Sequence, residues 1–206
     1  GLPTEGGSQK EITAVRESVS VRSSSSAALR EQMVTFIDIC CLDESGSTEG
    51  ETAAWGKAVA MTLLEITAEN RRSFALIHFA GSSSCQVDIF RPGEYTLKDK
   101  LTASETFLGG TNFERPIREA LRLMDTEGFE KTDVVFITDG ECELPDACQQ
   151  ELQSAQVAYH FTVTGILLDE GQSGMDFSLK PFCQKIYRTS ELTDNAVVQS
   201  VIGLLV

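Results

Sequence analysis

The sequence predicts an α/β fold in which a doubly wound, mostly parallel sheet has one antiparallel edge strand and helices on both faces. Short apolar runs of strand length alternate with longer segments of helical periodicity through most of the chain. Two of the apolar runs end directly in polar turns, as strands do at the binding edge of a doubly wound sheet. A third observation is size, because 206 residues that are 41% hydrophobic can bury the core of one α/β domain. We therefore expect a Rossmann-like arrangement.

The first 30 residues differ in character from the rest. A serine run covers 23–26, and a Gly-Gly-Ser sequence lies at 6–8. Both are typical of linkers, although Ile12, Val15 and Val19 have the spacing of a short helix. We expect residues 1–30 to be a linker or a partly disordered segment, and residues 31–206 to form the domain.

The first half of that domain should contain three strands and a long helix. Residues 36–42 and 74–80 are short and almost uniformly apolar, which is typical of buried strands. Residues 52–69 carry an apolar stripe that includes Trp55 and Val59 at helical spacing, so Trp55 is interpreted as a packing residue. Residues 85–90 alternate polar and apolar after a short turn, which predicts the antiparallel edge strand.

The second half continues the alternation of helices and strands. Its predicted helices are 97–107, which has the weaker pattern, 113–124, 145–156, the short 178–182, and the final 193–205. Its predicted strands are 134–137, 161–168 and 185–188. The expected order therefore favours parallel strands joined by crossover helices.

Charge and composition exclude several classes of function. The net charge of −14 and the pI near 4.5 argue against nucleic acid and against an anionic membrane surface as partners. No apolar run is long enough for a membrane span, and no secretory signal pattern is visible at the beginning of the sequence. The six cysteines include no Cys-x-x-Cys pair, and there are two histidines, so reduced thiols in a cytoplasmic protein are expected rather than a zinc site.

Oxygen-bearing side chains follow two of the predicted strands. Asp43, Ser45 and Ser47 come directly after the first strand, and Asp139 ends the strand at 134–137. Thr111 lies in a Gly-Gly-Thr loop before a helix. If the two strands are neighbours, both carboxylates meet at one edge of the sheet. Hydroxyls and carboxylates are hard ligands, which suit Mg²⁺, Mn²⁺ or Ca²⁺. Taken singly, each residue is an ordinary turn former or helix cap, so only the combination predicts a metal site.

This set resembles the metal-ion-dependent adhesion site (MIDAS) of the von Willebrand factor A (VWA) domain family. The family pattern D-x-S-x-S, then Thr, then Asp is met by Asp43, Ser45, Ser47, Thr111 and Asp139. The resemblance covers about residues 35–206. It implies that the two Ser and the Thr bind the metal directly, that the two Asp hold it largely through water, and that a partner's acidic side chain completes the coordination.

The sequence around these motifs is most similar to that of bacterial cytoplasmic CoxE-like and ViaA-like members of the family. Thr48 is an exception, because such members usually have Met at this position. That similarity implies that the domain is the carboxyl-terminal part of a larger protein and that it has no enzymatic activity. It also implies an adaptor or co-chaperone role beside a MoxR-type AAA+ ATPase.

Acidic residues surround both halves of the motif. Glu44 and Glu49 flank the first half, and Glu141 and Glu143 follow the last. They are an ordinary solvated surface in an acidic protein, or they form a rim around the metal. In the second case we expect them to select a partner whose ligating carboxylate is flanked by Lys or Arg.

Two other functions remain open from the sequence. Asp43 could be the nucleophile of a magnesium-dependent phosphoryl-transfer enzyme, but the residue two positions later is Ser45 rather than a second acid, and no G-x-x-x-x-G-K loop occurs. An extracellular adhesion module is the other alternative. His78 and His160 are interpreted as structural, hydrogen-bonded residues rather than ligands.

Overall fold

The structure is a computed structural model that describes residues 36–46, 50–81, 84–94, 110–126, 128–130, 132–140, 142–169 and 178–191. The predicted linker at 1–30 and the predicted helices at 97–107 and 193–205 lie outside these ranges. The strands are β1 (Phe36–Asp43), β2 (Phe74–Phe79), β3 (Cys85–Phe90), β4 (Thr132–Thr138), β5 (Val163–Leu167) and β6 (Lys185–Arg188). The α-helices are α2 (Glu51–Glu69), α4 (Glu114–Met124) and α5 (Asp146–Tyr159), and Thr189–Glu191 form a 3₁₀ turn.

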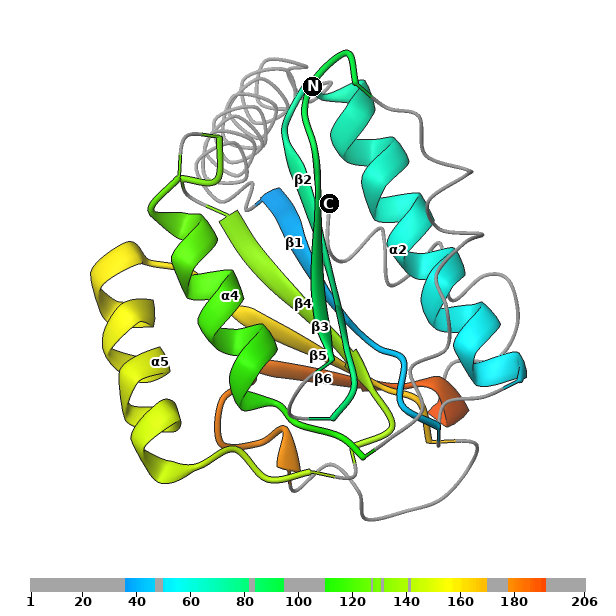
Figure 1. The fold of residues 1–206 in the computed structure, drawn as a ribbon, viewed down its shortest axis with the longest axis vertical. Coiled ribbons are helices and arrows are strands. Elements are labelled where there is room, and N and C mark those ends of the chain that lie inside the picture. The colour runs from blue at the N-terminus through cyan, green and yellow to red at the C-terminus, as the bar shows by residue number, and fades with distance from the viewer. Residues whose placement is uncertain are drawn as a thin grey trace, which may run out of the picture. The chain divides into compact units, whose positions relative to one another are not determined.

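Within the described residues the strands form one sheet in the order β3-β2-β1-β4-β5-β6 (Figure 1). All neighbours are parallel except β2 and β3, which pair antiparallel at the edge. The predicted fold class is confirmed, including the edge strand. Because β1 lies between β2 and β4, the chain reverses its direction of winding beside β1. Ligands of doubly wound sheets bind at the carboxyl ends of the strands at such a point.

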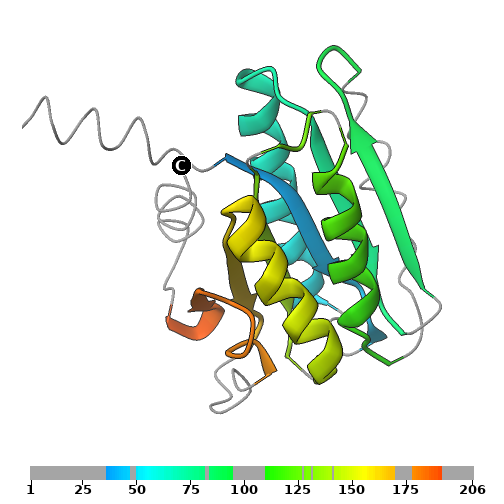
Figure 2. The same ribbon diagram turned by 90° about the vertical axis from the view of Figure 1, so that its left-hand side faces the viewer.

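Helices cover both faces of the sheet, as Figure 2 shows with α4 and α5 in front of it and α2 behind it. The strands bury alternate residues in two separate cores because successive side chains point to opposite faces. Cys41 and Ile77 belong to the core under α4 and α5, whereas Cys40 and Leu76 belong to the core under α2. Cys40 and Cys41, which are neighbours in β1, thus face opposite sides of the sheet, and Trp55 packs at the border of the second core.

The ends of several elements differ from the predictions. β4 begins two residues earlier than expected because the Thr132 hydroxyl donates to the Phe36 carbonyl and accepts from the Asp38 amide of β1. α5 continues three residues beyond its predicted end, although Val157 is exposed there. Its last turn is held by the Tyr159 hydroxyl, which donates a 2.7 Å hydrogen bond to Asp125, and it stops at His160, whose backbone is left-handed. None of the described helices has the length and apolar character needed to cross a membrane.

Candidate metal centre

Asp43 is the last residue of β1, and its carboxylate is buried. Its Oδ1 atom accepts a 2.9 Å hydrogen bond from the Ser45 amide, which folds the residues after β1 into a tight turn. Its Oδ2 atom accepts a 2.6 Å hydrogen bond from the Thr138 hydroxyl at the end of β4. Both carboxylate oxygens therefore have fixed directions, one set by the turn and one by the neighbouring strand.

Asp139 follows β4 directly and is also buried. Since β4 is the parallel neighbour of β1, Asp139 and Asp43 lie at the same edge of the sheet. Burial, together with the charge of Asp139, raises the pKa of Asp43 to about 6, although the hydrogen bonds from Thr138 and Ser45 act to lower it. Two adjacent carboxylates in a place that water barely reaches repel each other, and a divalent cation would offset that repulsion.

Thr111 lies at the same edge of the sheet, on the side of β1 where β2 lies. The Asn112 amide donates a 2.8 Å hydrogen bond to the Ala80 carbonyl, one residue after the position on β2 that pairs with Asp43. The ring of Phe113 packs against Phe79 of β2 and Phe136 of β4, with ring centroids 6.2 and 5.0 Å apart. Residues 110–113 are thus attached to both neighbours of β1, and Thr111 lies among them, partly buried.

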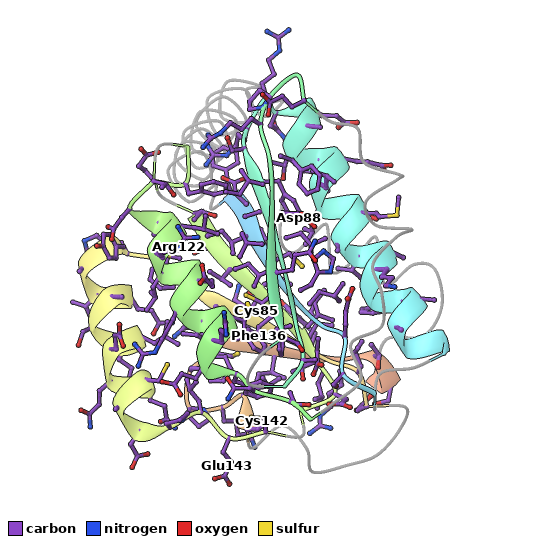
Figure 3. All side chains as sticks on the ribbon, in the orientation of Figure 1. Cys85, Asp88, Arg122, Phe136, Cys142 and Glu143 are labelled. Carbon is purple, nitrogen blue, oxygen red and sulfur yellow. The ribbon has the colours of Figure 1, made fainter. Side chains whose placement is uncertain are left out.

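The structure consequently brings Asp43, Ser45, Thr111 and Asp139 to one edge of the sheet, in loops that follow or adjoin β1, β2 and β4. Ser47, together with Glu49 and Glu141 of the expected rim, lies outside the described residues. Glu143 is exposed near the start of α5. In Figure 3 it lies with Cys142 at the lower end of the molecule, the end to which β1 runs.

The expectation that Glu44 belongs to an exposed rim is wrong. Its side chain is only 5% exposed, and its Oε1 atom lies 2.8 Å from Nδ1 of His78. The reason is the alternation of side chains beyond β1, which sends Glu44 to the face of the sheet where it meets His78, while Asp43 turns to the opposite face, where it meets Thr138. His78 is buried between two carboxylates, so the expectation that it is hydrogen-bonded is confirmed.

Three supporting residues were not assigned a role from the sequence. Thr138 orients Asp43. Ser178 donates a 2.7 Å hydrogen bond to the Gly140 carbonyl and so holds the loop after Asp139. Burial raises the pKa of the Cys142 thiol, and a hydrogen bond with the Phe113 backbone acts to lower it. This hydrogen bond links the loop after Asp139 to the loop that carries Thr111. Thr, Ser and Cys are common in strands and turns, so only the Thr-Asp-Gly sequence at the end of β4 could have drawn attention to Thr138.

The described donor set fits a hard divalent cation. Asp43 and Asp139 supply carboxylates, and Ser45 and Thr111 supply hydroxyls, with no sulfur or imidazole ligand among these four residues. A further buried acceptor, Oε2 of Glu44, has no hydrogen-bond partner among the described residues. An unsatisfied buried carboxylate oxygen calls for a physical explanation, such as an ordered water or an ion.

Comparison with known proteins agrees with this arrangement. A family model described as von Willebrand factor type A domain matches residues 39–141, from β1 to the loop after Asp139. Two relatives are uncharacterized proteins of Methanocaldococcus jannaschii. MJ0077 is 36% identical over 107 residues, which are 52% of this chain and 26% of the relative, and MJ0811 is 29% identical over 158 residues, which are 76% and 35%. The chain therefore spans about a quarter to a third of the length of these relatives.

Solved structures share the fold at low sequence identity. Proximal thread matrix protein 1 from the mussel byssus aligns with a TM-score of 0.62 at 16% identity, over 83% of this chain and 47% of that one. A von Willebrand factor type A protein from Catenulispora acidiphila aligns with a TM-score of 0.55 at 16% identity, over 81% and 41%. Since the matching family model covers half of the 206 residues, including Asp43 and Asp139, the chain belongs to the von Willebrand factor type A domain family.

Proposed function

We propose that this domain is a divalent-metal-dependent protein-binding module whose MIDAS consists of Asp43, Ser45, Ser47, Thr111 and Asp139. The observation that carries the proposal is the juxtaposition of Asp43 and Asp139 at the ends of adjacent strands, close enough for the charge of Asp139 to raise the pKa of Asp43. The family's commonest role, protein interaction, agrees with it.

The neutral and the charged residues of the site have different roles. Ser45, Ser47 and Thr111 would bind the cation through neutral hydroxyls, and Asp43 and Asp139 would hold it largely through water, so the two negative charges offset its charge without quenching its electrophilicity. The bound cation supplies an electrophilic position for one carboxylate of a partner protein. Burial of Asp43 excludes bulk water from one side of the site and fixes the carboxylate before any ligand arrives. We propose Mg²⁺ as the physiological ion, with Mn²⁺ or Ca²⁺ as substitutes.

The proposed partner is a protein that presents an acidic side chain. A MoxR-type AAA+ ATPase and an adaptor or co-chaperone role in the cytoplasm follow from the resemblance to CoxE-like and ViaA-like proteins. The length of the curated relatives supports this, because the matched region makes up only 26% and 35% of those proteins, which leaves room for regions that would contact an ATPase.

An enzyme that uses Asp43 as nucleophile is less well supported. Both oxygens of Asp43 accept internal hydrogen bonds, from Ser45 and from Thr138. In addition, the position two residues after Asp43 carries a serine where an aspartyl phosphatase would need its general acid. The buried, doubly bonded carboxylate is better suited to hold a cation's water than to attack phosphorus.

Calorimetric titration of the chain with Mn²⁺ and with Mg²⁺ tests the metal dependence directly, with Asp43→Ala and Asp139→Ala as variants that lack one carboxylate each. We expect saturable binding of one ion that both substitutions abolish. Co-purification with a MoxR-type ATPase from the same organism, in Mg²⁺ and in chelator, then tests the partner. Absence of metal binding by the folded parent chain would contradict the proposed function.

A further inference from the structure

Three ionisable side chains in contact with one another lead away from the candidate metal centre on the face of the sheet covered by α2. Glu44 contacts Nδ1 of His78, and Nε2 of His78 lies 3.3 Å from Oδ2 of Asp88 on the edge strand β3. The three side chains are 5%, 2% and 15% exposed. Figure 3 shows Asp88 well above Cys142, farther from the edge of the sheet that carries the site. The imidazole thus bridges two carboxylates, one beside the site and one remote from it.

Glu44 is bound firmly at one oxygen and left unsatisfied at the other. Its amide donates a 2.8 Å hydrogen bond to the Phe79 carbonyl, and its Oε1 is engaged by His78, so neither backbone nor side chain is free to turn. Its Oε2 is buried and has no partner in the part of the chain that the structure describes. Leaving a buried acceptor unsatisfied is costly, so a group outside these residues is expected to satisfy it.

The position of Glu44 indicates what that group is. Glu44 lies between Asp43 and Ser45 in sequence, and both neighbours belong to the proposed site. Among the described residues, however, Asp43, Glu44 and Asp139 do not gather as a cluster of three ligating side chains. Glu44 is therefore assigned to the outer shell of the proposed site, where a carboxylate contacts a water of the cation rather than the cation itself.

We propose that Glu44 is a third carboxylate of the metal centre, whose Oε2 accepts a hydrogen bond from the hydration shell of the cation, and that His78 is its positioning residue. This inference rests on the proposed function and adds residues outside the five-residue motif. Asp88 supports the imidazole from the far side, as outer carboxylates commonly orient histidines at metal sites. The chain thereby supplies three carboxylates near the cation and one imidazole behind them.

The test is the affinity for Mn²⁺, measured by calorimetry on the whole chain, together with the melting temperature of the metal-free protein. Glu44→Gln keeps the shape and the contact with His78 but removes the charge. It should weaken Mn²⁺ binding by about tenfold or more, while the melting temperature of the metal-free protein stays equal or rises because a buried, unsatisfied charge is gone. A merely structural residue would instead lower both quantities.

Two further variants test His78, and one serves as the control. His78→Leu should weaken Mn²⁺ binding as Glu44→Gln does, whereas His78→Asn, which keeps a donor near the position of Nδ1, should restore most of the affinity. Glu65→Gln removes an exposed carboxylate of α2 and should change the affinity by less than about threefold, because solvent and salt screen it.

The outcomes separate this inference from the proposed function. If the parent chain does not bind Mn²⁺, both are wrong. If the parent binds Mn²⁺ but Glu44→Gln behaves like Glu65→Gln, or loses melting temperature together with affinity, only the role of Glu44 is overturned. Equal affinities of His78→Leu and His78→Asn, both folded by circular dichroism, would overturn the role of His78.

Discussion

The hydroxyl of Thr138 donates a 2.6 Å hydrogen bond to Oδ2 of Asp43 and joins the ends of β4 and β1. The same hydroxyl accepts a 3.1 Å hydrogen bond from the amide of Gly140, in the loop that follows Asp139. Because Thr138 is fully buried, this pair of bonds is protected from water. One side chain therefore sets the direction of the first carboxylate and the path of the backbone that carries the second.

Replacing Thr138 by Val keeps the shape of the side chain and removes both hydrogen bonds. We expect the free energy of unfolding to fall by about 1 to 3 kcal/mol, the usual range for a buried hydrogen bond to a charged group. The pKa of Asp43 should rise above its value of about 6, because the lost bond favoured the ionised form. Urea unfolding and carboxyl NMR titration measure the two quantities.

Thr138→Ser is the matched control, since it keeps the hydroxyl and loses only a methyl group. It should retain the pKa of Asp43 and most of the affinity for Mn²⁺, whereas Thr138→Val should lose affinity several-fold. If Ser and Val at this position are indistinguishable in Mn²⁺ binding, the hydrogen bond to Asp43 does not orient a ligand.

The stability of the metal-free protein should depend on the ionisation of Asp43. The pKa of this carboxyl rises from an ordinary value of 3.8 to about 6 on folding, so the folded state favours the protonated acid. The stability that this group contributes is fully present below about pH 4 and is lost as the pH rises through about 6. Asp43→Asn has no ionisable group at this position. Its free energy of unfolding, relative to that of the parent, should therefore increase by about 2 to 3 kcal/mol between pH 4 and pH 7.5.

Urea unfolding of both proteins in chelator, at several pH values, measures this difference, and saturating Mg²⁺ should remove it by stabilising the parent alone. A difference between the two proteins that stays constant across that pH range would show that burial does not perturb Asp43.

The aromatic cluster beneath the site should matter to metal binding as well as to stability. Phe113 is fully buried between Phe79, Phe136 and Phe182 and lies two residues after Thr111. Phe113→Leu should lower the free energy of unfolding by about 1 to 2 kcal/mol. It should also weaken Mn²⁺ binding, because the loop that carries Thr111 loses its anchor.

Phe74→Leu is the control for this change. Phe74 is equally buried, pairs with Phe90 in the other core and lies at the opposite end of β2. It should destabilise the protein by a similar amount and leave Mn²⁺ affinity unchanged. Equal effects of the two substitutions on Mn²⁺ affinity would mean that the position of Thr111 does not depend on Phe113.

The fold class, and the two strand ends that carry Asp43 and Asp139, could be predicted because their signals are local. The buried strands are apolar runs in the sequence, and an acid directly after such a run marks the carboxyl end of a strand. The adjacency of β1 and β4 was only a condition of the predicted site, and the structure meets it. These inferences need no knowledge of side-chain contacts.

The surroundings of the site could not be predicted because they depend on partners distant in the sequence. Glutamate is usually exposed, and only the contact of Glu44 with His78, 34 positions away, shows that this side chain is buried. The role of Thr138 depends in the same way on Asp43, 95 positions away. Threonine is common in strands for its shape alone, so only the Thr-Asp-Gly sequence at the end of β4 draws attention to Thr138.

The remaining exposed acids should govern which partners the site accepts. Glu143 and Asp146 are exposed at the start of α5, and Glu114 is partly exposed at the start of α4. An isolated acidic ligand would be repelled by these charges, whereas a ligating carboxylate flanked by lysines would be attracted. We expect beads that carry a Lys-Asp-Lys peptide to retain the chain in Mg²⁺, and beads that carry Glu-Asp-Glu to retain much less.

Chelator should release the chain completely from either kind of bead, because retention needs the bound cation. Raising the salt from about 50 to 500 mM should weaken retention on Lys-Asp-Lys and narrow the difference between the two peptides, because exposed charges are screened. Glu143→Gln combined with Asp146→Asn should narrow that difference in the same way at low salt. If chelator releases the chain but neither salt nor these substitutions changes the preference, the acidic surface does not select the partner.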